Sequence, residues 1–455
     1  MGLFVRDADF LFVYEVKQRE LDSICLLGAW LETKGYRVAY VNTWDSMYNF
    51  RPEIRTKVAV IPACYTSGAY TFFTGQQALR FEKVVDLQWE QVLINMVTQS
   101  TVQTGWDFRG EALETRHVSW GENNVEYNHG RYGMGLDKMR VCGYLPLDFY
   151  REELRPATVS REELFARYGL DPAKKTVLFI SSFAEAGKPE SELELLDGDR
   201  DELMQNIRLQ EKSQEAILAW FRKLAQEDGS LQIVYRPHPA EADKPQFAES
   251  TKGVANFHVI GAESIRNWIL NCDILCNWKS TAMIETYVSG KQTLILHPEE
   301  IPFNFSMPFF EKGHYRAVTS YEELAAGIRE ENAEYPIEKD KLLQFYSVTE
   351  QPAYERTGQF LIDTLEDPDY HSPDIGGHAS AKGRILIHRP QARLAAGKAK
   401  LRYGLRRMRG GEMPEDVQED YRHHTYYEQK MRQNRITAQE LRAKIDAYKR
   451  MMGKA

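Results

Sequence analysis

The sequence lacks the usual marks of a membrane-spanning, secreted or disulfide-bonded protein. No segment approaches the about 18 consecutive apolar residues that a membrane-spanning helix needs. The N-terminus has no basic region followed by an apolar stretch, so we expect no signal peptide. Its five cysteines are an odd number scattered along the chain, which excludes a disulfide framework and favours a reducing compartment. These absences predict a cytoplasmic protein.

The length and composition are those of a multidomain globular enzyme. The chain has 455 residues, of which 43% are hydrophobic and 12% aromatic, enough for two separate cores. Apolar segments with strand character alternate with helical patterns on both sides of a charged linker near residues 155–161. We expect an N-terminal domain over residues 1–155, a second domain over 156–370 and an extension over 371–455. The alternation predicts an α/β fold with two Rossmann-like domains facing a cleft.

The most informative motif is Arg236-Pro237-His238-Pro239, which follows a short apolar segment, Leu231–Tyr235. Proline has a fixed φ and no N–H donor, so the two prolines end the strand and begin a loop. In open α/β sheets, ligands bind at such strand ends. Arg236 and His238 are therefore expected to bind an anion and to exchange a proton beside it.

A second motif has the same pattern. The segment Asp273–Asn277 is predicted to be a strand, and Ser280 and Thr281 follow it where a helix begins near Ala282. Free N–H groups and hydroxyls at a helix start favour a bound phosphate. The plainer interpretation is a loop turn at His238 and a simple cap at Ser280 and Thr281, but the ordered pair of motifs favours a phosphate site.

This arrangement resembles the donor half of bacterial surface-carbohydrate glycosyltransferases with the GT-B fold. It is most similar to families that carry a His-Pro motif and use CMP-activated acidic sugars, such as sialyltransferases and Kdo transferases. The segments Val141–Asp148, Tyr14–Leu21 and Gln88–Glu90 extend the resemblance, which covers roughly residues 10 to 350. CDP-glycerol phosphotransferases of teichoic acid synthesis carry a similar pattern, so the resemblance leaves the donor open.

The resemblance implies roles for individual residues. His238 would meet the donor phosphate and assist the departure of CMP, and Ser280 with Thr281 would bind the same phosphate. This chain has Ser-Thr where a sialyltransferase has Ser-Ser. Glu263 would bind the ribose hydroxyls, and Glu285 is the alternative for that role. Ser181 and Ser182, which end the predicted strand at residues 176–183, are expected to approach the donor phosphates.

The catalytic base for an acceptor hydroxyl is expected in the first domain. Glu15, at the end of the first predicted strand, and Glu90, beside Trp89, are the leading candidates, and Glu122 is a third. The plainer interpretation of each is an exposed or ion-paired glutamate. Asp197 and Asp199 have the spacing of a metal-binding pair but lie in a strongly polar stretch, so we expect a solvated loop there. No metal site and no cofactor beyond the donor are predicted.

The C-terminal extension has a different composition. Residues 381–455 contain 19 Lys and Arg against 8 Asp and Glu. Because the whole chain carries −8 and this segment +11, residues 1–380 carry −19, which argues against a nucleic-acid enzyme. Between Lys382 and Arg409 there are ten basic residues and no acidic one. In the same segment we expect a helix that is broken at Gly397 and Gly404. One side of this helix would carry Leu394, Leu401, Leu405 and Met408.

We expect residues 382–409 to lie on the anionic inner face of the cytoplasmic membrane. A solvated basic arm and a homo-oligomer contact are the alternatives. Deletion of residues 382–455 is then expected to release the protein from anionic membranes and to leave turnover of a soluble acceptor largely intact.

The sequence as a whole predicts transfer of an acidic sugar, of the Kdo or nonulosonate type, from a CMP-linked donor to a lipid-linked or oligosaccharide acceptor. The product would be a surface polysaccharide such as capsule, O-antigen or lipopolysaccharide. The alternatives are a CDP-polyol phosphotransferase, a UDP-sugar-dependent hexosyltransferase or 2-epimerase, and a non-catalytic scaffold of capsule assembly.

Overall fold

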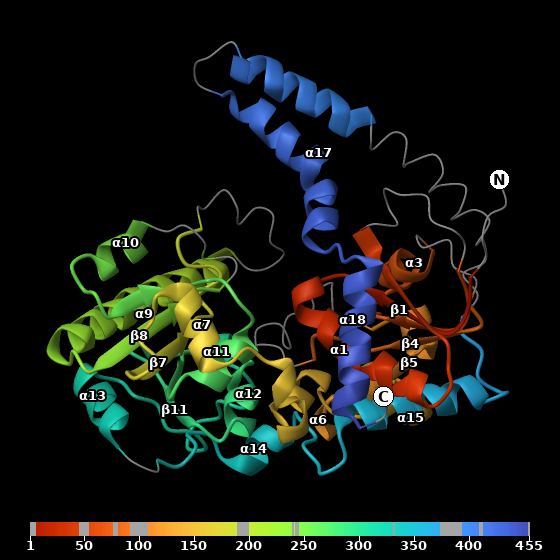
Figure 1. Ribbon diagram of the computed structural model, residues 1–455, viewed down its shortest axis with the longest axis horizontal. Helices are drawn as coiled ribbons and strands as arrows, with labels where there is room; N and C mark the ends of the chain where they lie inside the picture. The colour runs from red at the N-terminus through yellow and green to blue at the C-terminus, as the bar shows by residue number, and fades with distance from the viewer. Residues whose placement is uncertain are drawn as a thin grey trace. The chain divides into compact units, whose positions relative to one another are not determined.

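The computed structural model describes residues 6–44, 54–75, 81–91, 108–188, 200–238, 241, 245–330, 333–373, 394–408 and 413–453. These residues form two compact units (Figure 1). Of the described residues, those within 1–91, 105–146 and 347–455 belong to the first unit, and those within 147–346 belong to the second. Each unit is a parallel β-sheet with helices on both faces. The α/β class and the pair of Rossmann-like sheets expected of the GT-B fold are therefore confirmed.

The sheet of the first unit has the strand order β2-β1-β3-β4-β5-β6, and every neighbouring pair is parallel. Residues 10–14 belong to β1, which has a neighbouring strand on each side, and all five are buried. A parallel strand covered on both faces needs apolar side chains at every position. The strands are β1 (Arg6–Tyr14), β2 (Val38–Asn42), β3 (Ile54–Ile61), β4 (Lys83–Asp86), β5 (Arg116–Ser119) and β6 (Met139–Val141).

Two groups of helices cover this sheet. α1 (Lys17–Thr33), α15 (Ala353–Glu366) and α18 (Ala438–Met451) pack together on one face (Figure 1). The apolar core of the other face includes residues of α3 (Ser67–Gly75) and α5 (Glu111–Glu114). Other elements of the first unit are α6 (Glu122–Tyr132) and η1 (Leu136–Lys138). η2 (Leu145–Tyr150) spans the boundary at residue 147, and η3 (Glu152–Ala157) belongs to the second unit.

Helix α15 belongs to the first unit, although the second domain was expected to extend to residue 370. α15 packs against α1 and β3 of the first unit, and a Cβ at Gly358 would lie 2.3 Å from the Trp30 ring. Glycine thus allows the two helices to approach closely. The boundary differs because the periodicity of an amphipathic helix shows that it covers a core, but not which core.

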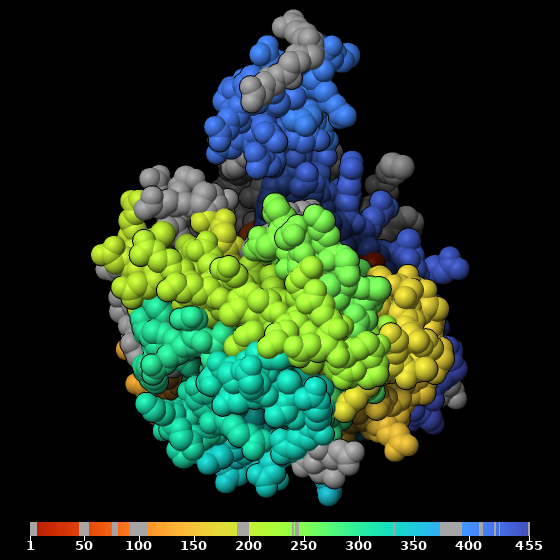
Figure 2. Space-filling view, turned by 90° about the vertical axis from the view of Figure 1, so that its left-hand side faces the viewer, coloured from red at the N-terminus to blue at the C-terminus, as the bar shows by residue number. Residues whose placement is uncertain are grey.

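The sheet of the second unit has the order β11-β10-β7-β8-β9, again with every neighbouring pair parallel. The long α9 (Arg200–Glu227) packs with α10 (Pro245–Thr251) and α13 (Tyr321–Arg329) on one face (Figures 1 and 2). α7 (Arg161–Tyr168) and α11 (Ile265–Asn271) pack on the other face. The other elements are β7 (Lys175–Ile180), β8 (Leu231–Arg236), β9 (Phe257–Val259), β10 (Ile274–Asn277), α12 (Met283–Val288), β11 (Gln292–Ile295), η5 (Phe303–Phe305) and α14 (Lys339–Leu343).

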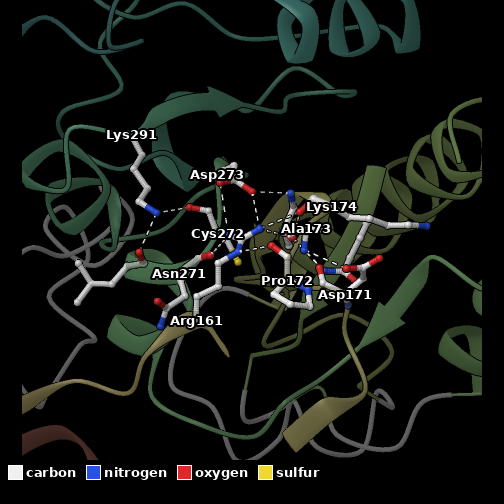
Figure 3. Close-up of polar contacts among 12 residues, drawn as sticks. Arg161, Asp171, Pro172, Ala173, Lys174, Asn271, Cys272, Asp273 and Lys291 are labelled. Carbon is white, nitrogen blue, oxygen red and sulfur yellow. Dashed lines mark hydrogen bonds and ion pairs between the residues drawn. The ribbon is translucent and has the colours of Figure 1, made fainter. Parts of the chain in front are cut away.

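A closed polar network holds the amino edge of this second sheet (Figure 3). The Arg161 guanidinium lies 3.0 Å from the Asp273 carboxylate and donates to the Lys174 carbonyl at 2.8 Å. Asp273 also accepts from the backbone N–H of Thr176 at 2.7 Å. The Lys291 ammonium donates to the backbone carbonyl of Leu270 at 2.8 Å and to that of Cys272. The charged groups at this edge therefore have partners within the protein.

The C-terminal segment is helical. Residues 394–408 form one continuous helix beside α17 (Glu415–Gln433), with Tyr403 stacked on Tyr421 at 4.2 Å and Arg402 paired with Asp420 at 2.9 Å (Figure 1). The expected breaks at Gly397 and Gly404 are wrong. A glycine costs a helix about 1 kcal/mol, and the packing against α17 offsets that cost. Residues 382–393 and Arg409 lie outside the described residues.

Helix α18 is built into the first unit. Its N-terminus has a capping box between Thr437 and Glu440, and it packs on α1 through Lys444–Asp22 at 2.5 Å and Arg442–Glu32 at 2.8 Å. Among the described residues, no helix is both long and apolar enough to cross a membrane.

Candidate functional site

The strand order of the second unit creates a topological switch point between β7 and β10. From β7 the chain adds β8 and β9 on one side and then returns to add β10 and β11 on the other. The helices α9 and α11 that make these connections lie on opposite faces of the sheet. A crevice is expected outside the carboxyl ends of two strands connected in this way, and ligands bind there in open α/β sheets.

Ser181, Ser182 and Ser280 follow the strands at this switch point. Ser181 is buried, and the Ser182 hydroxyl accepts a hydrogen bond from the backbone N–H of Lys279 at 3.3 Å. That bond joins the loop after β7 to the loop after β10. The structure thus brings three of the predicted hydroxyls to one edge of the sheet.

Arg236 is the last residue of β8, the neighbour of β7, and His238 lies in the loop that follows. Arg236 is largely buried, and its guanidinium donates to the backbone carbonyl of Glu263 at 3.3 Å. Burial lowers the pKa of Arg236, and the negative charge of Glu285 partly opposes this shift. Burial and the charge of Arg236 lower the pKa of His238, so its imidazole is neutral at neutral pH. Pro239 lies outside the described residues.

A buried network fixes the loop that carries His238. The Glu241 carboxylate accepts from the backbone N–H of His238, from the Tyr235 hydroxyl at 3.0 Å and from the Gln214 amide at 2.6 Å. The Tyr235 hydroxyl lies 3.2 Å from the Ser181 hydroxyl. His238 and Ser181 are therefore positioned by one connected set of hydrogen bonds.

Glu263 lies just before α11, whose N-cap is Ser264. Its two carboxylate oxygens accept from Arg167 at 2.6 Å and from Asn267 at 3.2 Å. Its φ is +69°, a conformation that non-glycine residues adopt rarely. Glu263 thus has partners within the protein, and its backbone carbonyl contacts Arg236.

Glu285, the alternative ribose ligand, lies in α12 and is 9% exposed. Its carboxylate accepts from the Tyr150 hydroxyl at 3.2 Å. Burial raises the pKa of Glu285 to about 7, although Tyr150, Arg266 and Arg236 each act to lower it. This carboxyl group is therefore partly protonated at neutral pH.

The expected helix cap at Ser280 and Thr281 is wrong. α12 begins at Met283 with Ala282 as its N-cap residue, and no side chain caps it. The Ser280 hydroxyl instead accepts from the backbone N–H of Ala282 at 3.1 Å, a local bond that serine forms readily in turns. The Thr281 side chain is exposed.

Several buried polar atoms at this carboxyl edge have no hydrogen-bond partner in the described part of the chain. They are Nε of Arg236, both amide atoms of Asn277 and Nε1 of Trp278. Asn277 and Trp278 are both 0% exposed. Buried polar groups are almost always paired, and each exception requires an explanation. At the amino edge, by contrast, Arg161, Asp273 and Lys291 are paired.

Lys279 is not among the residues that the sequence motifs single out. It follows Trp278 at the end of β10 and is 6% exposed. Its ammonium forms no ion pair or hydrogen bond with the described residues and lies 5.0 Å from the centroid of the Trp278 ring. A lysine directly after a buried strand is the signal that was available, but surface lysines give the same pattern.

In the first unit, Glu15 and Glu90 lie on either side of Arg19. The Arg19 guanidinium pairs with Glu90 at 2.5 Å and with the buried Glu20 at 2.8 Å, but lies 3.9 Å from Glu15. Burial raises the pKa of Glu15, and the negative charge of Glu90 adds to this shift. Glu122 is an exposed residue in the first turn of α6. The structure therefore groups Glu15 with Glu90.

Metal binding has no support from the described residues, in which no group of three or more His, Cys, Asp or Glu could bind a metal ion. Asp197 and Asp199 lie outside these residues. The five cysteines are all buried and unbonded, and burial raises the pKa of each thiol, for example that of Cys142 to about 12. Buried, protonated cysteines of this kind behave as small apolar residues.

No family model matches this chain, and no curated protein matches its sequence. Solved structures that match it include S. aureus MnaA with UDP, with 12% identity, 82% of this chain and 100% of that chain covered, and a TM-score of 0.47. The wall teichoic acid polymerase TagF with CDPG matches at 13% identity over 79% of this chain and 89% of that chain, with a TM-score of 0.47. A UDP-GlcNAc 2-epimerase from Neisseria meningitidis bound to UDP-GlcNAc matches at 11% identity over 85% and 100%, with a TM-score of 0.40.

Proposed function

We propose that the chain is a nucleotide-sugar-dependent glycosyltransferase of bacterial surface polysaccharide synthesis, and that its second unit binds the donor. The observation that carries this proposal is the set of unpartnered buried atoms of Arg236, Asn277 and Trp278 at the carboxyl edge of β8 and β10. A donor nucleotide supplies phosphate oxygens as acceptors for N–H groups, and its ribose and base supply both donors and acceptors. Such a ligand would satisfy these atoms together.

The proposed donor is a CMP-activated acidic sugar of the Kdo or nonulosonate type. Its phosphate and its sugar carboxylate each carry a negative charge, which favours a site with a buried arginine. Arg236 lies at the strand end next to Ser181, and the hydroxyls of Ser182 and Ser280 lie at the neighbouring switch point. Glu285 is the better-placed ribose ligand, because both carboxylate oxygens of Glu263 already accept hydrogen bonds.

The transfer breaks the bond between the anomeric carbon and the phosphate oxygen of CMP and forms a bond from that carbon to the acceptor hydroxyl oxygen. The departing phosphate gains negative charge, which Arg236 and a hydrogen bond from the neutral His238 would stabilise. Since the pKa of His238 is lowered in the free protein, its part at neutral pH is to donate a hydrogen bond, not to supply a proton from an imidazolium.

The proton of the acceptor hydroxyl would pass to Glu15. This carboxylate follows β1 at the switch point of the first sheet, where β1 lies between β2 and β3. Arg19 is occupied by Glu90 and Glu20, and the pKa of Glu15 is raised by burial. A carboxylate with a raised pKa is a better general base. Glu90 would then position Arg19 rather than accept the proton.

We also propose that the helix of residues 394–408 binds an anionic lipid surface, which would place the protein on the inner face of the cytoplasmic membrane beside a lipid-linked or oligosaccharide acceptor. The four apolar residues expected on one side are exposed, by 62% for Leu394, 63% for Leu401, 44% for Leu405 and 77% for Met408. At 3.6 residues per turn they lie within an arc of about 60°. The opposite side, with Ala396 and Tyr403, packs against α17.

Charge complementarity favours lipid over a second copy of the chain as the occupant of this apolar stripe. The helix carries five Lys and Arg and no acidic residue. Lys400 and Arg402 pair with Glu428 and Asp420 of α17, so Lys398, Arg406 and Arg407 are the ones that would contribute about 1 kcal/mol each near an anionic leaflet. A coiled-coil partner would need apolar residues at alternating spacings of three and four. Leu401, Leu405 and Met408 have such spacings, but the pattern does not extend further, because the position between Leu394 and Leu401 is Gly397 or Lys398.

Calorimetric titration of the full chain with CMP, CDP and UDP tests the donor site. We expect CMP to bind, and Arg236→Gln to weaken it by about 10- to 100-fold through loss of a charged hydrogen bond. Arg222→Gln is the matched control, because Arg222 donates only to the backbone carbonyls of Glu249, Ser250 and Lys252. Preference for CDP or UDP would overturn the proposed donor, and failure to bind any nucleotide would overturn the proposed function.

A further inference from the structure

Two lysines are buried among the residues that the structure describes, and their environments differ. Lys83 and Lys279 are each 6% exposed. The Lys83 ammonium donates to the backbone carbonyls of Thr364 at 2.9 Å and Leu365 at 3.0 Å, and also to that of Asp367. The Lys279 ammonium has no such acceptor in the described residues. Lys83 is thus a structural cation, and Lys279 requires another explanation.

The neighbours of Lys279 do not neutralise it. The carboxylate that influences it is that of Glu185, in the loop after β7, and Glu185 is already paired with Lys188 at 2.5 Å. His297, which follows β11, also lies close enough to interact with Lys279, and its pKa is lowered to about 4, so it is neutral at neutral pH. A buried ammonium without a paired carboxylate destabilises a protein.

The position of Lys279 shows what could offset this cost. Its backbone N–H bonds the Ser182 hydroxyl at the switch point between β7 and β10. Ser280 follows it directly, and the unpartnered amide of Asn277 precedes it in β10. A cation among hydroxyl and amide groups at the carboxyl edge of a parallel sheet matches the binding of a phosphate group.

We propose that the Lys279 ammonium binds the phosphate of the nucleotide donor directly and is the residue that makes this site select phosphorylated ligands. The inference rests on the proposed donor site of the second unit. Arg236 ends β8 and Lys279 lies in the loop after β10, so the cations that bind the phosphate come from strand ends on either side of β7. A lysine interacts with phosphate as a point charge, whereas the guanidinium of Arg236 adds directional hydrogen bonds.

Phosphate binding at Lys279 is coupled to the uptake of a proton by its amino group. Burial lowers the pKa of Lys279 to about 8, with Glu185 opposing the shift. A bound phosphate favours the charged form and raises that pKa again. Complex formation near pH 8 therefore takes up a proton, and the affinity for the nucleotide falls as the pH rises above about 8.

The test compares Lys279→Met with Lys83→Met, using CMP, cytidine and inorganic phosphate as probes of the full chain. We expect Lys279→Met to weaken CMP binding by about 10- to 100-fold and to leave cytidine binding unchanged. Its melting temperature without ligand should equal or exceed that of the wild type, because an uncompensated buried charge is removed. Lys83→Met should lower the melting temperature, since three carbonyls lose their donor, and should retain the CMP affinity of the wild type.

Wild-type CMP affinity in Lys279→Met would overturn the inference, as would an equal loss of CMP and cytidine binding. A fall in melting temperature as large as that of Lys83→Met would assign Lys279 a structural role instead. If the wild-type protein binds no nucleotide, the proposed function fails. The inference is then decided by inorganic phosphate alone, which must raise the melting temperature of the wild type but not that of Lys279→Met.

Discussion

The side-chain oxygen of Asn434 accepts a hydrogen bond from the backbone N–H of Lys17 at 2.6 Å, across a separation of 417 residues. Lys17 is the first residue of α1, and the N-cap residue Val16 has no side chain that can accept this bond. The Tyr14 hydroxyl donates to the Asn434 carbonyl at 3.1 Å. The C-terminal segment thus caps the helix that begins directly after Glu15.

We expect Asn434→Ala to lower the free energy of unfolding by about 1 kcal/mol, the usual cost of losing an N-cap. Asn434→Asp is the control, because its carboxylate keeps the acceptor and favours the positive end of the helix dipole. Urea denaturation followed by circular dichroism measures both. Equal stability of Asn434→Ala and wild type would show that water replaces the cap without cost.

This contact also corrects the expectation that residues 382–455 can be deleted without loss of turnover. The deletion removes Asn434 and α18, which pack on α1 of the first unit. Substitutions on the exposed stripe test membrane binding without that damage. We expect Leu401→Glu with Leu405→Glu to abolish sedimentation with anionic vesicles at low salt and to leave the melting temperature unchanged.

Leu136→Glu provides the matched control for the membrane test, because Leu136 is another leucine of the first unit and is 58% exposed. It should sediment like the wild type. The wild type should also be released by high salt, since the attraction of basic residues to an anionic leaflet is screened. Equal sedimentation of the double variant and the control would rule out the stripe as a lipid-binding surface.

His238→Ala tests the leaving-group role. If His238 stabilises charge that develops on the departing phosphate, its removal should lower kcat by ~10²–10³-fold and change KM little. Replacing both Ser280 and Thr281 by alanine should instead raise KM as well, because hydroxyls that bind the phosphate act in the ground state too. Steady-state kinetics with CMP-sugar donors separate these cases. An unchanged kcat in folded His238→Ala would make its loop purely structural.

Glu285 makes the stability of the protein depend on pH. Its pKa rises from 4.5 to about 7 on folding, so the native state binds the proton more tightly than the unfolded state. The free energy of unfolding therefore decreases as the pH rises from about 4.5 to about 7. We expect Glu285→Gln to be more stable than wild type at pH 8, by up to about 3 kcal/mol, and to show little difference at pH 4. If the difference in free energy of unfolding between Glu285→Gln and wild type is the same at pH 4 and at pH 8, this prediction is wrong.

Gly358→Ala tests the packing of α15 on α1. The added Cβ would lie 2.3 Å from the Trp30 ring, so the helices must separate or the ring must move, at a cost of about 1–3 kcal/mol. Gly397→Ala is the control, because no atom lies within 4 Å of a Cβ at that helical position. It should preserve or raise stability. Thermal denaturation of the two variants decides between these outcomes.

The strand ends that carry Arg236 and His238 were predictable because prolines mark where a buried apolar run stops. Those that carry Ser181 and Glu15 were also visible, since apolar runs give way there to polar residues. The role of Lys279 was not visible, because a lysine beside a strand is usually exposed. Its burial depends on the loops after β7 and β11, which are distant in sequence.

Two other differences between the structure and the expectations from the sequence have local causes. The cap expected at Ser280 and Thr281 does not form, because the Ser280 hydroxyl bonds the N–H of Ala282 in a turn, a competition that sequence spacing does not resolve. The partners of Glu263 could not be foreseen, since Arg167 lies on a separate helix. Side-chain pairing across elements needs the tertiary structure.

The closed network at the amino edge of the second sheet has an evolutionary consequence. Arg161, Asp273 and Lys291 find their partners among residues of the same edge, so substitutions in the loops after β7, β8 and β10 leave these bonds intact. The sheet can therefore carry different loops at its carboxyl edge while the bonds of its amino edge are kept.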